Sequence, residues 1–117
     1  MSEKGKEDAL TKTYDFMLWS FPQIARFPKT HKFILGDRIQ NHLLDVHERL
    51  IEARFTRDKK PILARVNLSL EQLRHLFRLA KDLRLINLKK YEHTARELDA
   101  IGRFVGGWIK SLEGRRA

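Results

Sequence analysis

Cysteine is absent from the sequence, which excludes a disulfide framework and a thiolate metal site. Proline occurs only at Pro22, Pro28 and Pro61, and no stretch shows the strand-and-turn pattern of a β protein. Long apolar runs are also missing: the longest uncharged run, residues 16–25, has ten residues, too few to span a bilayer. The first twelve residues lack the apolar stretch of a secretory signal. We therefore expect a cytoplasmic protein with no membrane contact.

Helical periodicity is what the sequence does contain. The 117 residues are enough for one domain with a modest core. Apolar residues recur every three or four positions over residues 9–27, 30–55 and 61–85, and a fourth helix is expected to follow Asn87, whose side chain suits an N-cap. Short connections make neighbouring helices antiparallel, so the predicted fold class is all-α, an antiparallel up-down four-helix bundle.

The predicted domain boundaries follow from these helices and from the polar ends of the chain. We expect residues 1–10 to form a flexible polar tail, residues 11–112 to form the bundle, and residues 113–117 to form a short basic tail. Pro22 is expected to bend the first helix and Pro28 to end it.

Each predicted helix has an apolar face that should point into the core. The first face consists of Leu10, Tyr14, Met17, Phe21 and Ile24. The second consists of Phe33, Ile39, Leu43, Val46, Leu50 and Ala53. The third consists of Ile62, Val66, Leu73, Leu76, Phe77, Ala80 and Leu83. The fourth, stepping four and three residues in turn, consists of Tyr91, Ala95, Leu98, Gly102, Val105, Ile109 and Leu112.

The third helix has more apolar residues than one face needs. Leu68, Leu79 and Ile86 fall on a different flank, together with His75. Two readings stay open: these are scattered exposed residues of the ordinary kind, or they contact another subunit.

Positive charge is in excess, at a net +9 from 24 Lys and Arg against 15 Asp and Glu. Residues 54–90 alone hold 11 basic and 3 acidic residues. On the third helix an arc of about 60° carries what we call the Arg74 stripe, which consists of Lys60, Arg74, Arg78 and Lys81. Only Glu71 and Asp82 are acidic nearby in sequence, so this stripe is a candidate for phosphate contacts. Arg84 is expected at the end of this helix, near the edge of the arc of residues that faces the core.

A second stripe, on the fourth helix, is expected to be an ordinary solvated face. We call it the Arg103 stripe, and it consists of Lys89, Arg96, Arg103 and Lys110. Acidic residues follow three of these four after three positions, at Glu92, Asp99 and Glu113. Ion pairs at this spacing would largely cancel the local field.

Catalytic and metal-binding patterns are weak. No Glu-x-x-His spacing for a bundle di-metal site occurs, and His42 with Asp45 is a single pair. Arg26 and His31 have the Arg-x4-His spacing of one class of helical ribonucleases, but Pro28 interrupts the helix that would present them. We expect no enzymatic activity, no metal and no cofactor.

Glycine and tryptophan in the fourth helix predict close packing. Gly102, Gly106 and Gly107 each weaken a helix by about 1 kcal/mol relative to alanine, so we expect close helix approach there. Trp108 is expected to be buried against a neighbouring helix, near Trp19.

Three segments resemble a known family. They are YDFMLWSFPQIARFPKTHKFILGDRI, EARF and above all RLAKDLRLINLKKYEHTARELDAIGRFVGGWIK. These segments are similar to the four-helix-bundle family that includes the accessory variability determinant (Avd) of diversity-generating retroelements and the proteins encoded in 23S rRNA intervening sequences. The closing GRFVGGWIK and the block from DLRL to YEH look most similar to the Avd branch. The resemblance covers most of the chain from Tyr14 to Lys110.

This resemblance implies a small basic protein, homopentameric in the characterised case, that binds nucleic acid and the retroelement reverse transcriptase. Such proteins take part in the mutagenic copying of a template repeat RNA. The resemblance implies core or interface roles for Leu79, Ala80, Leu83, Tyr91, Gly102, Gly106, Gly107 and Trp108. The basic positions of the family's third helix are matched by Arg74, Arg78, Lys81 and Arg84. The family has no catalytic residue to transfer.

We therefore predict a noncatalytic accessory protein that forms a homopentamer, binds RNA or DNA through a basic surface and docks on a reverse transcriptase. The candidate nucleic-acid-binding residues are Arg74, Arg78, Lys81, Arg84, Lys60, Lys59, Arg57, Lys89 and Lys90. The alternative is a structural helix-bundle module, of the intervening-sequence type, whose basic face binds an acidic protein partner.

Overall fold

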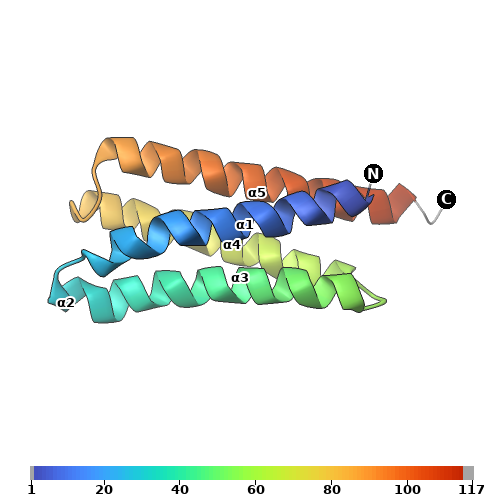
Figure 1. Cartoon of the computed structure of the whole chain (residues 1–117), viewed down its shortest axis with the longest axis horizontal. Coiled ribbons are helices and arrows are strands. Elements are labelled where there is room, and N and C mark those ends of the chain that lie inside the picture. The colour runs from blue at the N-terminus through green and yellow to red at the C-terminus, as the bar shows by residue number, and fades with distance from the viewer. Residues whose placement is uncertain (1, 115–117) are drawn as a thin grey trace.

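Long helices make up the fold. The computed structural model describes residues 2–114, with side chains for residues 9–113. The elements are α1 (Ser2–Ala25), α2 (Lys29–His31), the π-helical turn η1 (Lys32–Gly36), α3 (Asp37–Phe55), α4 (Lys60–Asp82) and α5 (Leu88–Gly114) (Figure 1). No strand occurs in the described part of the chain, and α2, η1 and α3 follow one another directly. The predicted all-α four-helix bundle is confirmed.

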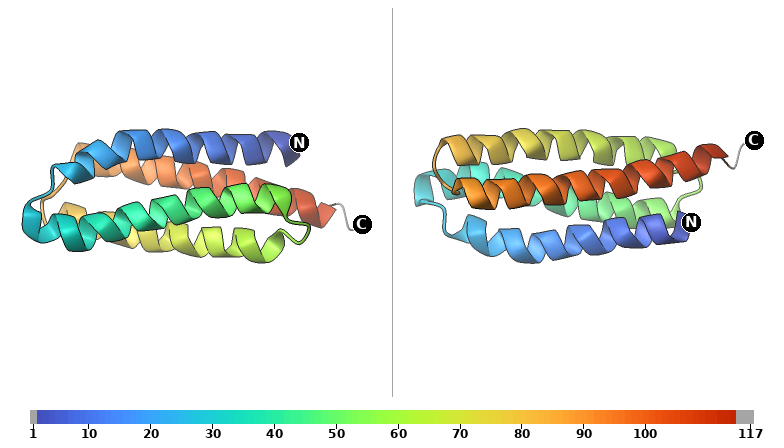
Figure 2. Two further views of the ribbon diagram at one scale, coloured as in Figure 1. Left: turned by 60° about the horizontal axis from the view of Figure 1, so that its bottom comes forward. Right: turned by 90° about the horizontal axis from the view of Figure 1, so that it is seen from above.

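The four long helices alternate in direction along a rod of 51 × 23 × 20 Å (Figures 1 and 2). α1 packs against α3 and α5, and α4 packs against the same two helices. The order around the bundle is therefore α1, α3, α4, α5. The α1–α2 and α4–α5 connections lie at one end of the rod, and the α3–α4 connection lies at the other (Figure 1).

Proline and asparagine set helix boundaries as predicted. Pro28 follows the end of α1, and Pro61 lies in the first turn of α4, where its missing N–H is no loss. Asn87 caps α5, because its Oδ1 accepts a hydrogen bond from the backbone N–H of Lys90 at 2.8 Å.

The start of α1 differs from the prediction. The helix begins at Ser2 rather than near Ala9, so most of the segment predicted as a tail has helical backbone. Residues 115–117, which belong to the predicted basic tail, lie outside the described residues.

α4 ends in a Schellman motif with arginine at the position where glycine is usual. The N–H of Leu85 donates to the carbonyl of Ala80, and the N–H of Arg84 donates to the carbonyl of Lys81, both at 2.9 Å. Arg84 has a φ of 63°, a conformation that is unfavourable for any residue with a Cβ. Because the helix ends at Asp82, the predicted position of Arg84 at the edge of the helix's core-facing side is wrong.

Because α4 ends at Asp82, two apolar residues that follow it differ from the prediction in how deeply they are buried. Leu83, predicted to lie in the core, is 43% exposed, whereas Ile86, predicted to be left over for a neighbour, is only 8% exposed. Counting 100° per residue fails beyond Asp82, where the chain is no longer helical. Leu68 and Leu79 are exposed, as predicted.

Two aromatic residues predicted for the core lie at the surface: Tyr14 is 53% exposed and Phe33 is 58% exposed. Phe33 comes six residues before Ile39, which places it about 120° away around a helix, and Leu35 is buried in its place. On α1 the residues that face the core are Ala9, Thr13, Phe16, Met17, Ser20 and Ile24.

The core face of α5 has the predicted spacing but only partly the predicted members. The buried residues are Thr94, Leu98, Ile101, Val105 and Trp108, which also step four and three in turn. Leu98 and Val105 belong to both sets. The other predicted members lie at the edge of the face. The four-three spacing alone therefore did not identify which residues of α5 are buried.

Trp108 is buried as predicted, but it is not near Trp19. Trp19 packs on His93, with 4.5 Å between the ring centroids. His93 lies about 22 Å before Trp108 along α5. The predicted pairing of the two tryptophans is therefore wrong.

Candidate nucleic-acid interface

The positive charge that is continuous in sequence over residues 54–90 is divided in space. α4 occupies most of this segment and spans about 34 Å with its 23 residues. Residues 54–65 bring five basic residues and one Asp to one end of the rod. Residues 81–90 bring four basic residues and one Asp to the other end. Residues 66–80, between them, hold two Arg and one Glu. The basic residues of this segment are therefore found mainly at the two ends of the rod.

Arg74, in the middle of α4, is held by acids from two helices. Its Nη1 lies 3.1 Å from Oε2 of Glu71 on the same helix, and its Nε lies 3.4 Å from Oδ1 of Asp99 on α5. Solvated pairs of this kind contribute at most about 1 kcal/mol each. They nevertheless compensate the guanidinium charge.

Arg78 and Lys81 also have an acidic partner. Both approach Asp82, with N···O distances of 4.0 Å for Arg78 and 3.4 Å for Lys81. The Lys81 ammonium also lies 4.7 Å from the centroid of the Tyr91 ring, a cation–π contact.

The fourth member of the Arg74 stripe is paired across helices. Nζ of Lys60 lies 3.8 Å from Oε1 of Glu113 on α5. The two acids nearest in sequence are not the only ones near this stripe in the folded bundle, because α5 supplies two more, Asp99 and Glu113.

In contrast to the Arg74 stripe, the Arg103 stripe has fewer ion pairs than predicted. The i,i+3 ion pairs predicted to neutralise it do not form within 4.0 Å, and Asp99 and Glu113 pair with α4 instead. None of its four members is ion-paired with any residue whose side chain is described. The stripe predicted to be self-neutralised is therefore the one with unpaired cations.

Lys59, one of the predicted site residues, has a structural role. Its ammonium donates hydrogen bonds to the carbonyls of Ala53 at 2.7 Å, Thr56 at 2.8 Å and Arg54 at 3.4 Å. These carbonyls lie at the C-terminal end of α3, where a cation is favoured by the helix dipole. Lys59 therefore caps α3.

Four of the nine predicted site residues have neither an ion-pair partner among the described side chains nor a hydrogen-bonding role like that of Lys59. They are Arg57, Arg84, Lys89 and Lys90. Arg57 lies at one end of the rod and the other three at the opposite end. The structure thus brings together only part of the predicted set.

The two stripes meet in a hollow between α4 and α5. This hollow, of about 440 Å³, is lined by Asn67, Glu71, Arg74, Asp99, Gly102 and Arg103. A Cβ on Gly102 would lie 3.2 Å from Nη2 of Arg74, so the glycine makes room for the guanidinium. The atoms nearest to this Cβ belong to side chains of α4 and not to its backbone, so the predicted close approach of two helices is not seen at Gly102.

Gly106 and Gly107 have no close neighbour in the described part of the chain. Apart from the adjoining backbone of α5, no atom lies within 4 Å of a Cβ built at either position, and both residues are exposed. Nothing in the described part of the chain explains why these positions are glycine.

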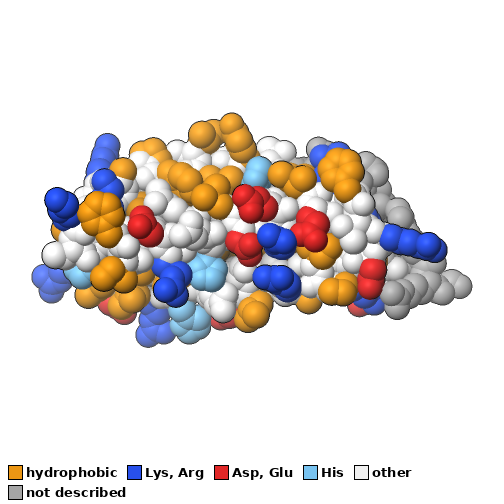
Figure 3. All heavy atoms as spheres, turned by 90° about the horizontal axis from the view of Figure 1, so that it is seen from below, with side chains coloured by type: hydrophobic (Ala, Val, Ile, Leu, Met, Phe, Trp, Pro, Cys, Tyr) orange, Lys and Arg blue, Asp and Glu red, His pale blue; other side chains and the backbone are white. Residues whose placement is uncertain are grey.

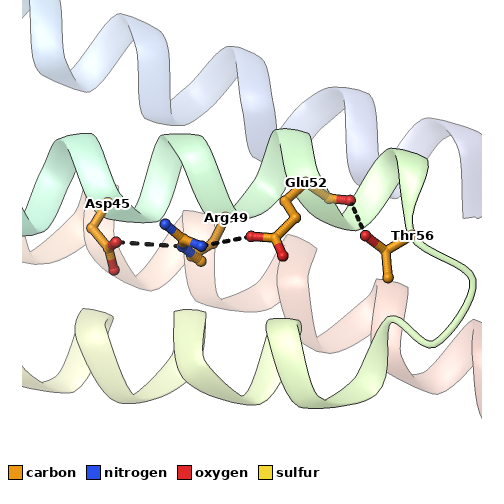
Figure 4. A network of polar contacts seen from close by, with 4 residues as sticks. All are labelled: Asp45, Arg49, Glu52 and Thr56. Carbon is orange, nitrogen blue, oxygen red and sulfur yellow. Dashed lines mark hydrogen bonds and ion pairs between the residues drawn. The ribbon is translucent and has the colours of Figure 1, made fainter.

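The opposite side of α4 faces a wider groove against α3. This groove, of about 490 Å³, is lined by Arg38, Asn41, His42, Asp45, Arg65, Leu68, Ser69 and Gln72. Near it on α3, Arg49 is held between Asp45 at 3.4 Å and Glu52 at 2.6 Å, and the Thr56 hydroxyl donates to the Glu52 carbonyl at 2.8 Å (Figure 4). Its cation is compensated, so this network is a poor phosphate site.

Apolar surface is concentrated between α1 and α3. A groove of about 310 Å³ is lined by Tyr14, Met17, Leu18, Phe21, Pro22 and Leu44. Figure 3 shows hydrophobic side chains interspersed with charged ones on the face that includes α3. Leu68 and Leu79 form a separate apolar flank on α4.

Metal and membrane sites find no support in the described part of the chain. No group of three or more His, Asp or Glu side chains is arranged to hold a metal ion there. Among the described helices, none is long and apolar enough to cross a bilayer.

The comparison with known proteins agrees with this architecture. A family model described as bAvd-like matches residues 9–112, nearly the whole described chain. No curated protein and no solved structure matches the chain. A match of this extent supports an Avd-type accessory variability determinant, a noncatalytic type of protein with an accessory role in diversity-generating retroelements. The four-helix bundle with an excess of positive charge therefore belongs to the bAvd-like family.

Proposed function

We propose that this protein binds RNA or DNA and associates with the reverse transcriptase of its retroelement during mutagenic retrohoming, without itself catalysing a reaction. The binding surface in this proposal is the face formed by α4 and α5, which carries both basic stripes. We further propose that the protein acts in the cytoplasm, as a homopentamer.

The unpaired cations of the Arg103 stripe are the observation that best supports nucleic-acid binding. Its members repeat every seven residues, so successive cations stand about 10.5 Å apart along α5. Lysine and arginine without acidic partners can neutralise phosphates and release their counterions, which gives affinity without reading sequence. Arg74, Arg78 and Lys81 lie beside this row, although the acids paired with them compensate much of their charge.

A salt series measures the phosphate contacts. Arg96→Gln combined with Arg103→Gln should weaken binding to a labelled RNA–DNA or DNA duplex and reduce the slope of log affinity against log salt by about 1.8, which is 0.9 per lost contact. Fluorescence anisotropy at several salt concentrations gives both values.

A matched control is Arg49→Gln, which removes an arginine that Asp45 and Glu52 already compensate. Its affinity and slope should stay those of the unmodified protein. Equal slopes for all three proteins would refute the assignment of the α4–α5 face. Charge reversal of Arg74, Arg78 and Lys81 then measures the contribution of the predicted stripe on the same face.

The proposed homopentamer needs two different contact surfaces on each subunit, because neighbours in a cyclic ring meet head to tail. The apolar groove between α1 and α3 and the Leu68–Leu79 flank of α4 are two such surfaces. Light scattering should give about five times the chain mass of 13.9 kDa. A mass equal to one chain at micromolar concentration would contradict the proposal.

Association with the reverse transcriptase is tested by co-purification of the two proteins after nuclease treatment, so that nucleic acid cannot bridge them. Retention of the reverse transcriptase is the expected result. Absence of any gel shift with RNA and DNA would instead favour the alternative function, a module that binds an acidic protein partner.

A further inference from the structure

Positive charge gathers at the end of the rod where α1 passes to α2 and α4 passes to α5 (Figures 1 and 2). We call this the basic end and define it by residues 26–38 and 81–90. Together these segments hold eight of the 24 Lys and Arg residues but only two of the 15 Asp and Glu residues. In Figure 3, blue side chains cluster at this end, on the left.

Most of these cations have no acidic partner. Of the eight, only Lys81 forms an ion pair with a residue whose side chain is described. The two acids at this end are Asp37 and Asp82, and Asp82 is shared between Lys81 and Arg78. The basic end therefore retains most of its charge for an external anion.

Three of the cations occupy positions where the local backbone disfavours them. Lys89 and Lys90 lie in the first turn of α5, where the helix dipole favours acids, and that turn contains no acid. Arg84 occupies the left-handed position at the end of α4, where glycine would be easier. A sequence that breaks a local rule repeatedly at one place is typical of a functional site.

An aromatic ring and an aliphatic side chain are exposed at the same end of the rod. Phe33 and Ile34, in the π-turn η1, are 58% and 75% exposed. The next two residues, Leu35 and Gly36, are buried, and a Cβ on Gly36 would lie only 2.8 Å from Cγ2 of Ile24. η1 is thus packed tightly against α1, which holds Phe33 outward on a fixed support.

We propose that the basic end binds single-stranded nucleic acid, with the Phe33 ring stacking on an unpaired base and Lys29, Lys32, Lys89 and Lys90 contacting phosphates. This inference rests on the proposed function and adds to it a second contact area and a strand preference. A base within a duplex has both faces covered by its neighbours, so an exposed aromatic ring can stack only on an unpaired one. Basic residues that follow the phosphate backbone, together with aromatic rings that stack on bases, are the combination used to bind single strands.

The experiment measures the affinity for a labelled single-stranded RNA and for the duplex formed with its complement, by fluorescence anisotropy. Phe33→Leu keeps an apolar side chain and removes the ring, and is expected to weaken single-strand binding about tenfold while leaving duplex binding unchanged. Phe33→Trp should restore or improve it.

The matched control is Phe55→Leu, because Phe55 is an exposed phenylalanine at the opposite end of the rod. Its single-strand affinity should equal that of the unmodified protein. Both leucine substitutions are at exposed sites, and unchanged circular dichroism confirms that the bundle remains folded.

Several results would overturn the inference. Equal single-strand affinities for Phe33→Leu and the unmodified protein would remove the basic end as a stacking site while leaving binding by the α4–α5 face intact. Binding to vesicles of anionic lipid that is lost in Phe33→Leu, with unchanged RNA binding, would assign this end to a membrane surface. If the unmodified protein bound neither the single strand nor the duplex, the proposed function itself would fail.

Discussion

Glycine in place of Arg84 is expected to stabilise the bundle even though it removes a side chain from the surface. Arg84 holds a φ of 63° in the Schellman motif that ends α4. Placing a residue with a Cβ in this left-handed region costs about 1–2 kcal/mol. Glycine relieves that strain but increases the entropy of the unfolded chain, which offsets about 0.4–1 kcal/mol. The net gain in the free energy of unfolding is therefore about 0.8 kcal/mol.

Urea denaturation at a fixed protein concentration measures this gain, since assembly would make stability depend on concentration. The thermal midpoint should rise by roughly 2–5 °C for a domain of this size. Arg84→Ala is the control, because it removes the same charge but keeps the Cβ at positive φ. An alanine variant as stable as the glycine variant would refute the backbone argument.

Three further predictions test the fold and the assembly. Lys59→Met should lower the free energy of unfolding by about 1–2 kcal/mol in urea denaturation, because the α3 carbonyls lose a charged donor; Lys60→Met, which loses only a solvated pair at 3.8 Å, should change it by less than about 0.5 kcal/mol. Ile101→Ala should lower the same free energy by about 2–5 kcal/mol, since the side chain is fully buried, and a loss below 1 kcal/mol would contradict its place in the core. Gly106→Ala should raise the helicity and stability of the subunit by up to about 1 kcal/mol, because an added Cβ meets no atom; a lower assembly mass by light scattering would show instead that a neighbouring subunit contacts Gly106.

The class of fold was predictable because periodicity, prolines and caps agree along this chain. Pro28, Pro61 and Asn87 mark helix boundaries through local chemistry that does not depend on tertiary packing. The core members were less predictable, because a four-three spacing fits two neighbouring seams of α5 equally well. Burial of Ile101 rather than Gly102 is decided by the facing helices.

Charge compensation was the part of the candidate site that sequence could not reveal. Glu71 and Asp82 are visible as partners because they lie within one turn of Arg74 and Arg78. Asp99 is also close in sequence to Arg96, but in the folded bundle it turns to Arg74 on another helix. To predict that Asp99 pairs with Arg74 rather than Arg96, one must know the register of α4 against α5, and local sequence patterns do not specify it.

The register of the chain before α3 depends on η1. In a π-turn the backbone N–H reaches five residues back rather than four, as the N–H of Asp37 does to the carbonyl of Lys32. The wide turn thus accommodates one residue more than an α-helical turn of the same rise. A regular α-helix over the same rise would hold one residue fewer, with α3 in its present register. Phe33 and Ile34 consequently lie on the turn that sets how the preceding chain is rotated relative to α3.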